Sequence, residues 1–166
     1  EAALKAGNVD FYVGPRPGRA LPSDLIEEKL ADNTRTILGR KGHPLVKARS
    51  LRDLIDAEWA TTSITLEAED ELGELFAGYQ LPKPRLALRS QSALTLIVSL
   101  ANTDLLAMVP VQWTAFNVTA QALAPILVKE KLSAPPLVVI RRGGLPLTPA
   151  AEYFVDLMRR RSLASS

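Results

Sequence analysis

Short apolar runs along the chain alternate with stretches in which apolar residues recur every three or four positions. The short runs have the length and composition of buried strands, and the three-to-four spacing is that of amphipathic helices. We predict strands at 10–14, 25–30, 35–39, 60–65, 85–89, 105–110, 125–130 and 136–142. We predict helices at 51–59, 67–79, 92–101, 111–116 and 149–161. Strands that alternate with helices indicate an α/β fold whose sheet is mostly parallel.

Two of these helices begin with recognisable capping residues. Ser50 and Asp53 are spaced as in a capping box, in which each side chain accepts a hydrogen bond from the other residue's backbone N–H. Thr148 stands in the N-cap position of the last helix, and Pro149 follows it in the first turn, where a missing N–H is tolerated. These capping residues therefore predict where the two helices begin.

Proline-rich segments at 14–22 and 134–136 predict that the chain crosses twice between two lobes. The two ends of the chain would then form one lobe, from residues 1–33 and 134–166, and residues 34–133 would form the other. A hinge in the crossings would let ligand binding change the angle between the lobes. The predicted hinge residues are Gly14, Pro15, Ala134 and Pro135.

Composition narrows the chemistry available to this fold. The chain has 166 residues, 47% of them hydrophobic and 23% charged, and its formal net charge of +2 gives no broad basic face for nucleic acid. It has no cysteine and only one histidine, His43, which argues against disulfides, thiolate or histidine metal sites and a Ser-His-Asp triad. The longest apolar run is too short to span a bilayer. We therefore expect no catalytic residues, no metal, no cofactor and no membrane contact, and a cytoplasmic protein.

Four stretches of the sequence together resemble the effector-binding domain of LysR-type transcriptional regulators. In chain order they read LKAGNVDFYVG, DLIEEKLADNTRTILGRKGHPL, SLRDLIDAEW and LPLTPAAEYFVDLMRR, and they span nearly the whole chain. The resemblance implies two α/β lobes of the periplasmic-binding-protein type II fold, with a small-molecule effector held between them. The sequence differs from the family pattern at 102–104, where Asn102 and Asp104 stand in place of the glycines of a common Gly-x-Gly.

The resemblance also implies partners and a larger protein. Regulators of this family form homodimers or tetramers, and they bind DNA through an N-terminal winged helix-turn-helix that these residues do not contain. The first strand–helix–strand of the first lobe is also missing, so we expect that lobe to be incomplete and the chain to be truncated at its N-terminus.

Two hydroxyl-rich strand-to-helix junctions are the candidate ligand site. Hydroxyls and free backbone N–H groups at a helix start can hold a carboxylate or sulfonate without a buried cation. The resemblance points to the same junctions, beside the crevice between the lobes. The candidate residues are Thr62, Ser63, Ile64, Thr65, Arg89, Ser90, Gln91, Ser92 and Pro110. The alternative is that these hydroxyls only stabilise turns and cap helices.

Other functions stay open at this point. A solute-binding protein of a transport system has the same fold class, and so does an enzyme acting on small acids. The acidic stretch 67–74 could form a carboxylate pair, although a solvated helix face with acids in its first turns explains it better. The stretch LGRKGHPL, which contains His43, lacks the spacing of a phosphate-binding loop and is interpreted as a turn after a strand.

Overall fold

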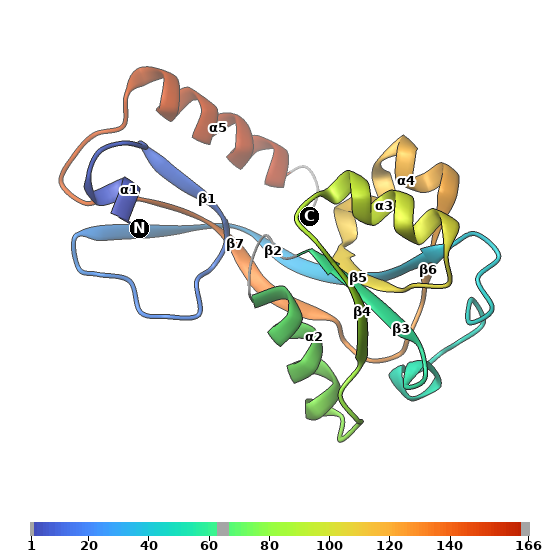
Figure 1. Ribbon diagram of the computed structural model, residues 1–166. Coiled ribbons are helices and arrows are strands. Elements are labelled where there is room, and N and C mark those ends of the chain that lie inside the picture. The colour runs from blue at the N-terminus through green and yellow to red at the C-terminus, as the bar shows by residue number, and fades with distance from the viewer. Residues whose placement is uncertain (1, 63–66, 164–166) are drawn as a thin grey trace. The chain divides into compact units, whose positions relative to one another are not determined.

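The computed structural model describes residues 2–62 and 67–163, which Figure 1 draws in colour. The chain divides into two compact units, one formed by Glu1–Asn33 and Ala134–Ser166 and the other by Thr34–Ser133. We call them the terminal unit and the central unit. No helix in the described ranges is long and apolar enough to cross a membrane.

The terminal unit is built on antiparallel strands. Its elements are α1 (Ala2–Lys5), β1 (Phe11–Pro15), the first part of β2 (Leu25–Arg40), β7 (Ser133–Arg142) and α5 (Pro149–Leu163). β1 pairs antiparallel with β7, and β7 also neighbours β2. A small core gathers Leu4, Leu25, Val138 and Ile140. The aromatic rings of Phe11 and Phe154 lie 6.0 Å apart and connect β1 to α5.

The sheet of the central unit combines parallel and antiparallel strands. Its strands are the second part of β2, β3 (Glu58–Thr62), β4 (Arg85–Ser90), β5 (Ala107–Pro110) and β6 (Leu123–Ile126). β2 pairs antiparallel with β5 and with β6, whereas β3 and β4 run parallel. A parallel bridge between Trp59 and Leu106 joins β3 to the segment entering β5. The order across the unit is therefore β4, β3, β5, β2 and β6.

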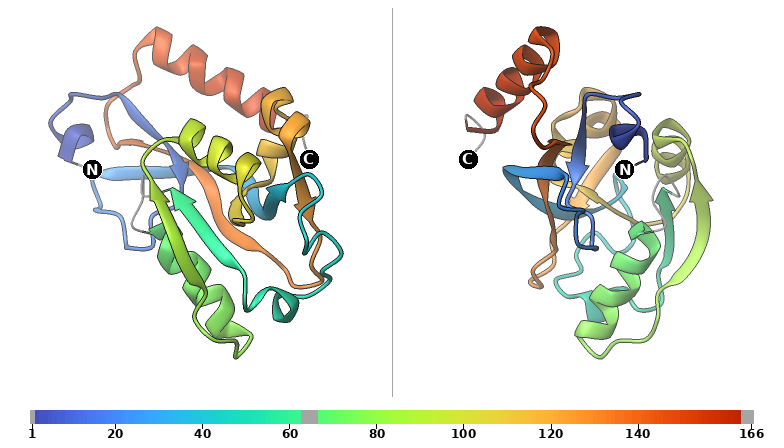
Figure 2. Two further views of the ribbon diagram at one scale, coloured as in Figure 1. Left: turned by 45° about the vertical axis from the view of Figure 1, so that its right-hand side comes forward. Right: turned by 90° about the vertical axis from the view of Figure 1, so that its left-hand side faces the viewer.

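Helices cover both faces of this central sheet, as Figures 1 and 2 show. They are the 3-10 turns η1 (Leu51–Leu54) and η2 (Val111–Ala115) and the helices α2 (Glu67–Gly78), α3 (Ala93–Asn102) and α4 (Asn117–Ala122). One core cluster packs α2 and η1 around Trp59 and Phe76. A second packs α3 against β5 and β6 around Leu96 and Leu100. Each face thus buries the apolar side of an amphipathic helix.

Several sequence-based boundaries were wrong for physical reasons. The strands predicted separately at 25–30 and 35–39 form one strand, because β2 continues through the residues between them. The Asn33 side-chain amide donates to the Pro135 carbonyl (3.1 Å), and the Arg35 N–H donates to the Leu132 carbonyl (2.8 Å). Pairing to a neighbouring segment thereby overrides local turn propensity. The predicted helix at 51–59 is a single 3-10 turn, and the strand expected at 125–130 lies at Leu123–Ile126.

The prediction of a mostly parallel sheet was also wrong. It rested on strands alternating with helices, which holds only for β3, β4 and β5. β2 pairs antiparallel with β5 and with β6, although several helices and strands separate these partners from it along the chain. Strand direction across such long connections is not set by local sequence, so the alternation of strand and helix signals overestimates parallel pairing.

Both predicted helix caps are confirmed. The Ser50 hydroxyl accepts the Arg52 N–H (3.3 Å), and the Asp53 carboxylate accepts the Ser50 N–H (3.1 Å). At α5 the Thr148 hydroxyl accepts the Ala151 N–H at 3.3 Å. Capping residues act within four positions of sequence, which is why the sequence alone reveals them.

Candidate functional site

Three parallel strands of the central unit end at one edge of its sheet. β3 ends at Thr62, β4 at Ser90 and β5 at Pro110, and each strand leads towards a helix or helical turn. Thr62 and Ser90 are direct partners in the parallel register of β3 and β4. Because the Trp59–Leu106 bridge is also parallel, the end of β5 points to the same edge. Open α/β sheets bind ligands at such an edge, where helix N-termini present free N–H groups.

The junction after β4 is organised by its own serines. The Ser90 side chain is 8% exposed, and its hydroxyl accepts the Ser92 N–H (3.1 Å) and donates to the Ser92 carbonyl (3.0 Å). The Ser92 hydroxyl in turn accepts the Thr95 N–H at 3.3 Å and caps α3. Both serines therefore stabilise the turn and the helix start. From the sequence, this role was the alternative to direct ligand binding. Gln91, between them, is exposed.

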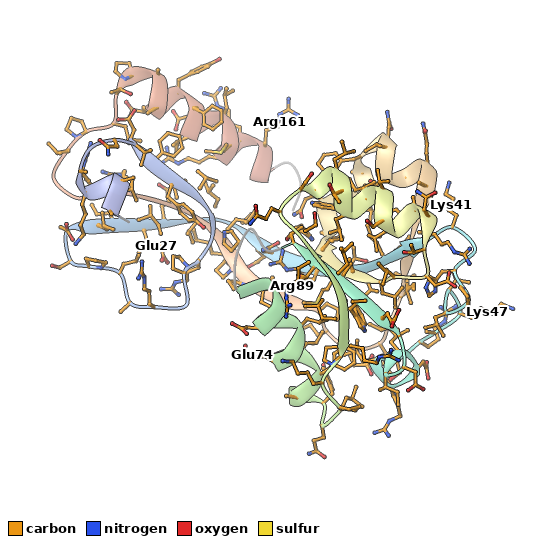
Figure 3. All side chains as sticks on the ribbon, in the orientation of Figure 1. Glu27, Lys41, Lys47, Glu74, Arg89 and Arg161 are labelled. Atoms are coloured by element: carbon orange, nitrogen blue, oxygen red, sulfur yellow. The ribbon has the colours of Figure 1, made fainter. Side chains whose placement is uncertain are left out.

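The remaining candidate residues have different positions. Thr62 and Pro110 are half-buried at the ends of their strands. Arg89 lies on β4 opposite Thr61, whose side chain is 7% exposed, and Figure 3 labels Arg89 there. Three further candidates, Ser63, Ile64 and Thr65, lie outside the described residues. The structure thus brings the ends of β3, β4 and β5 to one edge of the sheet.

Sequence reasoning missed a shielded ion pair beside this edge. Arg35 lies opposite Pro110 in the β2–β5 register. Its guanidinium makes a bidentate bond to the Glu71 carboxylate on α2, with N–O distances of 2.8 and 3.1 Å. The two side chains are only 10% and 21% exposed. A signal was present, because the charged residue Arg35 begins the strand predicted at 35–39. Its partner 36 positions later could not be identified without the fold.

The four predicted hinge residues lie in strands. Gly14 and Pro15 belong to β1, opposite Val138 and Leu137 of β7. Ala134 and Pro135 belong to β7 itself, and the Pro135 carbonyl accepts a hydrogen bond from Asn33. The segment predicted as a crossing at 14–22 therefore begins inside the paired sheet of the terminal unit.

His43 occupies a turn of the central unit and is 3% exposed. Its Nδ1 accepts the Leu45 N–H (3.0 Å), which leaves Nε2 to donate to the Asp104 carbonyl (3.0 Å). Gly42 precedes it with a positive φ of 72°, a conformation that glycine adopts without strain. Both ring nitrogens are thus engaged by backbone groups. Across the described ranges, His, Asp and Glu side chains form no group of three that could hold a metal ion.

The groups at this edge suit the binding of an anion. It offers a buried strand end, a capped start of the ten-residue helix α3 and the exposed amide of Gln91. The N-terminal N–H groups and the dipole of a helix favour an anion. Among the described residues at these strand ends, no side-chain pair has the geometry of a nucleophile and its general base.

Comparison with known proteins identifies the family of this chain and a curated relative. Residues 1–162 match the LysR substrate binding domain. A curated relative is the HTH-type transcriptional regulator GalR of Pseudomonas putida, 26% identical over 158 residues, which are 95% of this chain and 40% of that protein. The chain therefore spans about two fifths of the length of this relative.

Solved structures share the fold. The regulatory domain of CcmR from Synechocystis PCC6803, in complex with 2-PG, has a TM-score of 0.78 and 16% identity, with 97% of this chain and 77% of that chain covered. The effector binding domain of QuiR, in complex with shikimate, has a TM-score of 0.76 and 16% identity, with 98% and 76% covered. These similarities establish a fold of the type described for LysR regulatory domains, the periplasmic-binding-protein-like type II fold.

Proposed function

Because the chain belongs to the LysR substrate binding domain family, a family of transcriptional regulators, we propose that it is the effector-sensing part of such a regulator. It binds a small organic anion, and that binding controls how a full-length protein engages DNA. We assign residues 1–33 with 134–166 to the first lobe of the family and residues 34–133 to the second. A regulator of chromosomal DNA acts in the cytoplasm, where we place this protein.

The observation that carries the proposal is the convergence of Thr62, Ser90 and Pro110 at the carboxyl edge of β3, β4 and β5. The start of α3 lies at this edge, and its dipole favours a negative ligand. Two relatives of the same fold were solved with 2-PG and with shikimate, and shikimate is a small carboxylate. We propose that Ser63, Ile64, Thr65 and Arg89 complete the ligand contacts.

The serine interactions sharpen how the ligand is held. The Ser90 and Ser92 hydroxyls are engaged in the turn and the cap, so we propose that they position backbone N–H groups for the ligand. Gln91 presents its amide at the same junction and is exposed. A side-chain amide can donate two hydrogen bonds to a carboxylate. We therefore assign a direct side-chain contact at this junction to Gln91, beside that of Arg89.

A screen of small carboxylates by backbone-amide NMR tests the site, with shikimate as its first member. The expected result is a ligand that shifts the amides of Thr62, Gln91 and Ala93 at low concentration. Gln91→Ala should lower the affinity for that ligand by about fivefold, which corresponds to the loss of one exposed hydrogen bond. Gln121→Ala is the matched control, because Gln121 is also exposed and lies near the end of α4. Equal affinity for both variants, or shifts confined to other elements, would refute the assignment.

We also propose that the chain pairs with a second copy through the outer face of α3. Leu94 and Val98 are four positions apart on this helix and are 64% and 52% exposed. Apolar side chains at this spacing form one stripe, and pairing would remove the stripe from water. Sedimentation should show a dimer or tetramer that Val98→Glu converts to a monomer. A monomeric wild-type chain at high concentration would count against this interface.

A further inference from the structure

A pocket of about 390 Å³ lies in the central unit, distinct from the strand ends at Thr62, Ser90 and Pro110. Its volume is in the range of small-molecule sites, roughly 300–1,000 Å³. It adjoins Leu38 and Lys41, near the carboxyl end of β2. Because β2 and β5 are antiparallel, with Arg35 opposite Pro110 and Leu38 opposite Ala107, this is the other end of the sheet.

Apolar side chains of paired strands form the floor of the pocket. Leu38 of β2 and Leu123 of β6 are 1% and 3% exposed and belong to the core under α3. Ala124 and Pro125 of β6 also line it, and they pair with Gly39 and Leu38 in the antiparallel register. This floor is fixed by backbone pairing, so an apolar ligand would meet a preformed surface.

Two threonines form the side of the pocket towards η2 and α4, and their hydrogen bonds are made within the protein. The Thr119 hydroxyl is buried and hydrogen-bonds the backbone carbonyls of Trp113 and Phe116. The Thr114 hydroxyl donates to the Val111 carbonyl at 2.7 Å. These bonds hold the turn between η2 and α4 in place. The threonine methyl groups add apolar surface to the wall.

Lys41 is the charged residue of the pocket lining. Its backbone N–H donates to the Ala122 carbonyl (2.9 Å), which fixes the base of the side chain beside the pocket. Within the described part of the chain, the Lys41 ammonium makes no ion pair or hydrogen bond. The preceding Arg40 differs, because its guanidinium bonds the Asp104 carboxylate at 2.7 Å. The exposed Lys41 side chain, labelled in Figure 3, is thus available to a ligand.

We infer that this pocket binds a small amphipathic anion, with its apolar body on Leu38 and Leu123 and its carboxylate at Lys41. The apolar floor accounts for the body, and the lining contains a cation and no carboxylate. This would be a second ligand site in the same unit, and it does not depend on the site proposed at the strand ends.

Phenylacetate and phenylacetamide are a suitable pair of probes, because they have the same shape and differ in charge. In an NMR titration of the full chain, both compounds should shift the amide signals of Lys41, Thr119 and Leu123. Phenylacetate should bind more tightly than phenylacetamide. Lys41→Gln should lower the affinity for phenylacetate by about fivefold, the upper value for an exposed ion pair, and leave the affinity for phenylacetamide unchanged. Lys47→Gln is the matched control, since Lys47 is exposed and lies outside the pocket lining.

A second variant fills the pocket without removing charge. Ala120 is an exposed lining residue on α4, and Ala120→Trp should abolish binding of both probes. Gln91→Ala should leave both unchanged, which separates this pocket from the strand-end site. The inference is overturned if neither probe shifts these amides at millimolar concentration. It is equally overturned if Lys41→Gln and Lys47→Gln bind phenylacetate alike, or if binding survives in a folded Ala120→Trp chain.

Discussion

The central and terminal units bury apolar residues very differently. The central unit has a core on each face of its sheet, with Trp59, Phe76 and Leu100 fully buried. The terminal unit has a cluster of four buried residues. It exposes large apolar side chains at Tyr12, Val13, Ile26, Tyr153, Phe154 and Leu157. Burial of apolar surface is the dominant stabilising term, so the central unit is expected to be the more stable.

One ion pair from each unit shows a similar contrast. In the central unit the Arg35–Glu71 pair is shielded, with side chains 10% and 21% exposed. In the terminal unit Arg159 bonds Glu28 and Asp156, but the Arg159 and Glu28 side chains are each 40% exposed. Water and salt weaken exposed pairs far more than shielded ones. The candidate site at the strand ends therefore lies in the unit with the larger buried core.

The largest expected effect comes from truncating one phenylalanine in each unit. Phe76 is 0% exposed and packs edge-on against Trp59 at 5.6 Å, whereas Phe154 is 53% exposed. Phe76→Ala should lower the free energy of unfolding by about 3–5 kcal/mol, because it removes buried surface and leaves a cavity. Phe154→Ala should cost below about 1 kcal/mol, mainly from its contact with Phe11. Urea unfolding followed by circular dichroism measures both, and equal losses would contradict the comparison.

Buried polar side chains give the next largest effect. His43→Ala removes the partners of the Leu45 N–H and the Asp104 carbonyl, and should cost about 2–3 kcal/mol. Asn33→Ala in the terminal unit removes one partner, that of the Pro135 carbonyl, and should cost about 1 kcal/mol. Thermal unfolding of both variants measures the difference. A neutral His43→Ala variant would show that this turn does not need its histidine.

The sequence predicted much of the architecture because its signals are local. The strands at 85–89 and 136–142 and the cap at Thr148 depend on residues within one element, and the structure contains them. The single long β2 was not predictable in this way. Its continuation past Asn33 depends on the Leu132 and Pro135 carbonyls, about a hundred positions away in the sequence.

The candidate site was predictable only in outline. Strand-to-helix junctions can be read from periodicity, and the pairing of Thr62 with Ser90 then follows from the parallel register of β3 and β4. The engagement of Ser90 and Ser92 with their own turn was one of two interpretations open from sequence. The Arg35–Glu71 pair was missed because it joins a strand to a helix through tertiary packing.

Double-mutant cycles on the two ion pairs should give smaller values and sharpen the comparison. The coupling free energy between Arg35→Ala and Glu71→Ala is expected to be about 1–2 kcal/mol, since the pair is shielded and bidentate. Between Arg159→Ala and Glu28→Ala it should stay below about 1 kcal/mol. Urea unfolding of the four single and two double variants provides both numbers. A larger coupling in the terminal unit would reverse the proposed order.

The smallest effect is a dependence of terminal-unit stability on pH. The hydrogen bond and charge of Arg159 hold the pKa of Glu28 below its ordinary value of 4.5, against the opposing effect of burial. A pKa lowered by folding stabilises the protein above the unfolded value, and that stabilisation is lost as the pH falls through the folded value.

Glu28→Gln should therefore lower the free energy of unfolding by up to about 1 kcal/mol at neutral pH, a size set by the 40% exposure of both side chains. This loss of stability should shrink towards zero as the pH falls below the ordinary pKa of a glutamate carboxyl group. Urea unfolding between about pH 7 and pH 3 measures it, and high salt should reduce it by screening. In an Arg159→Ala chain the same substitution should have a much smaller pH-dependent effect, because the guanidinium that lowers the Glu28 pKa is gone. A difference that persists at acidic pH in the wild-type background would mean that Glu28 contributes through packing of its side chain and not through its charge.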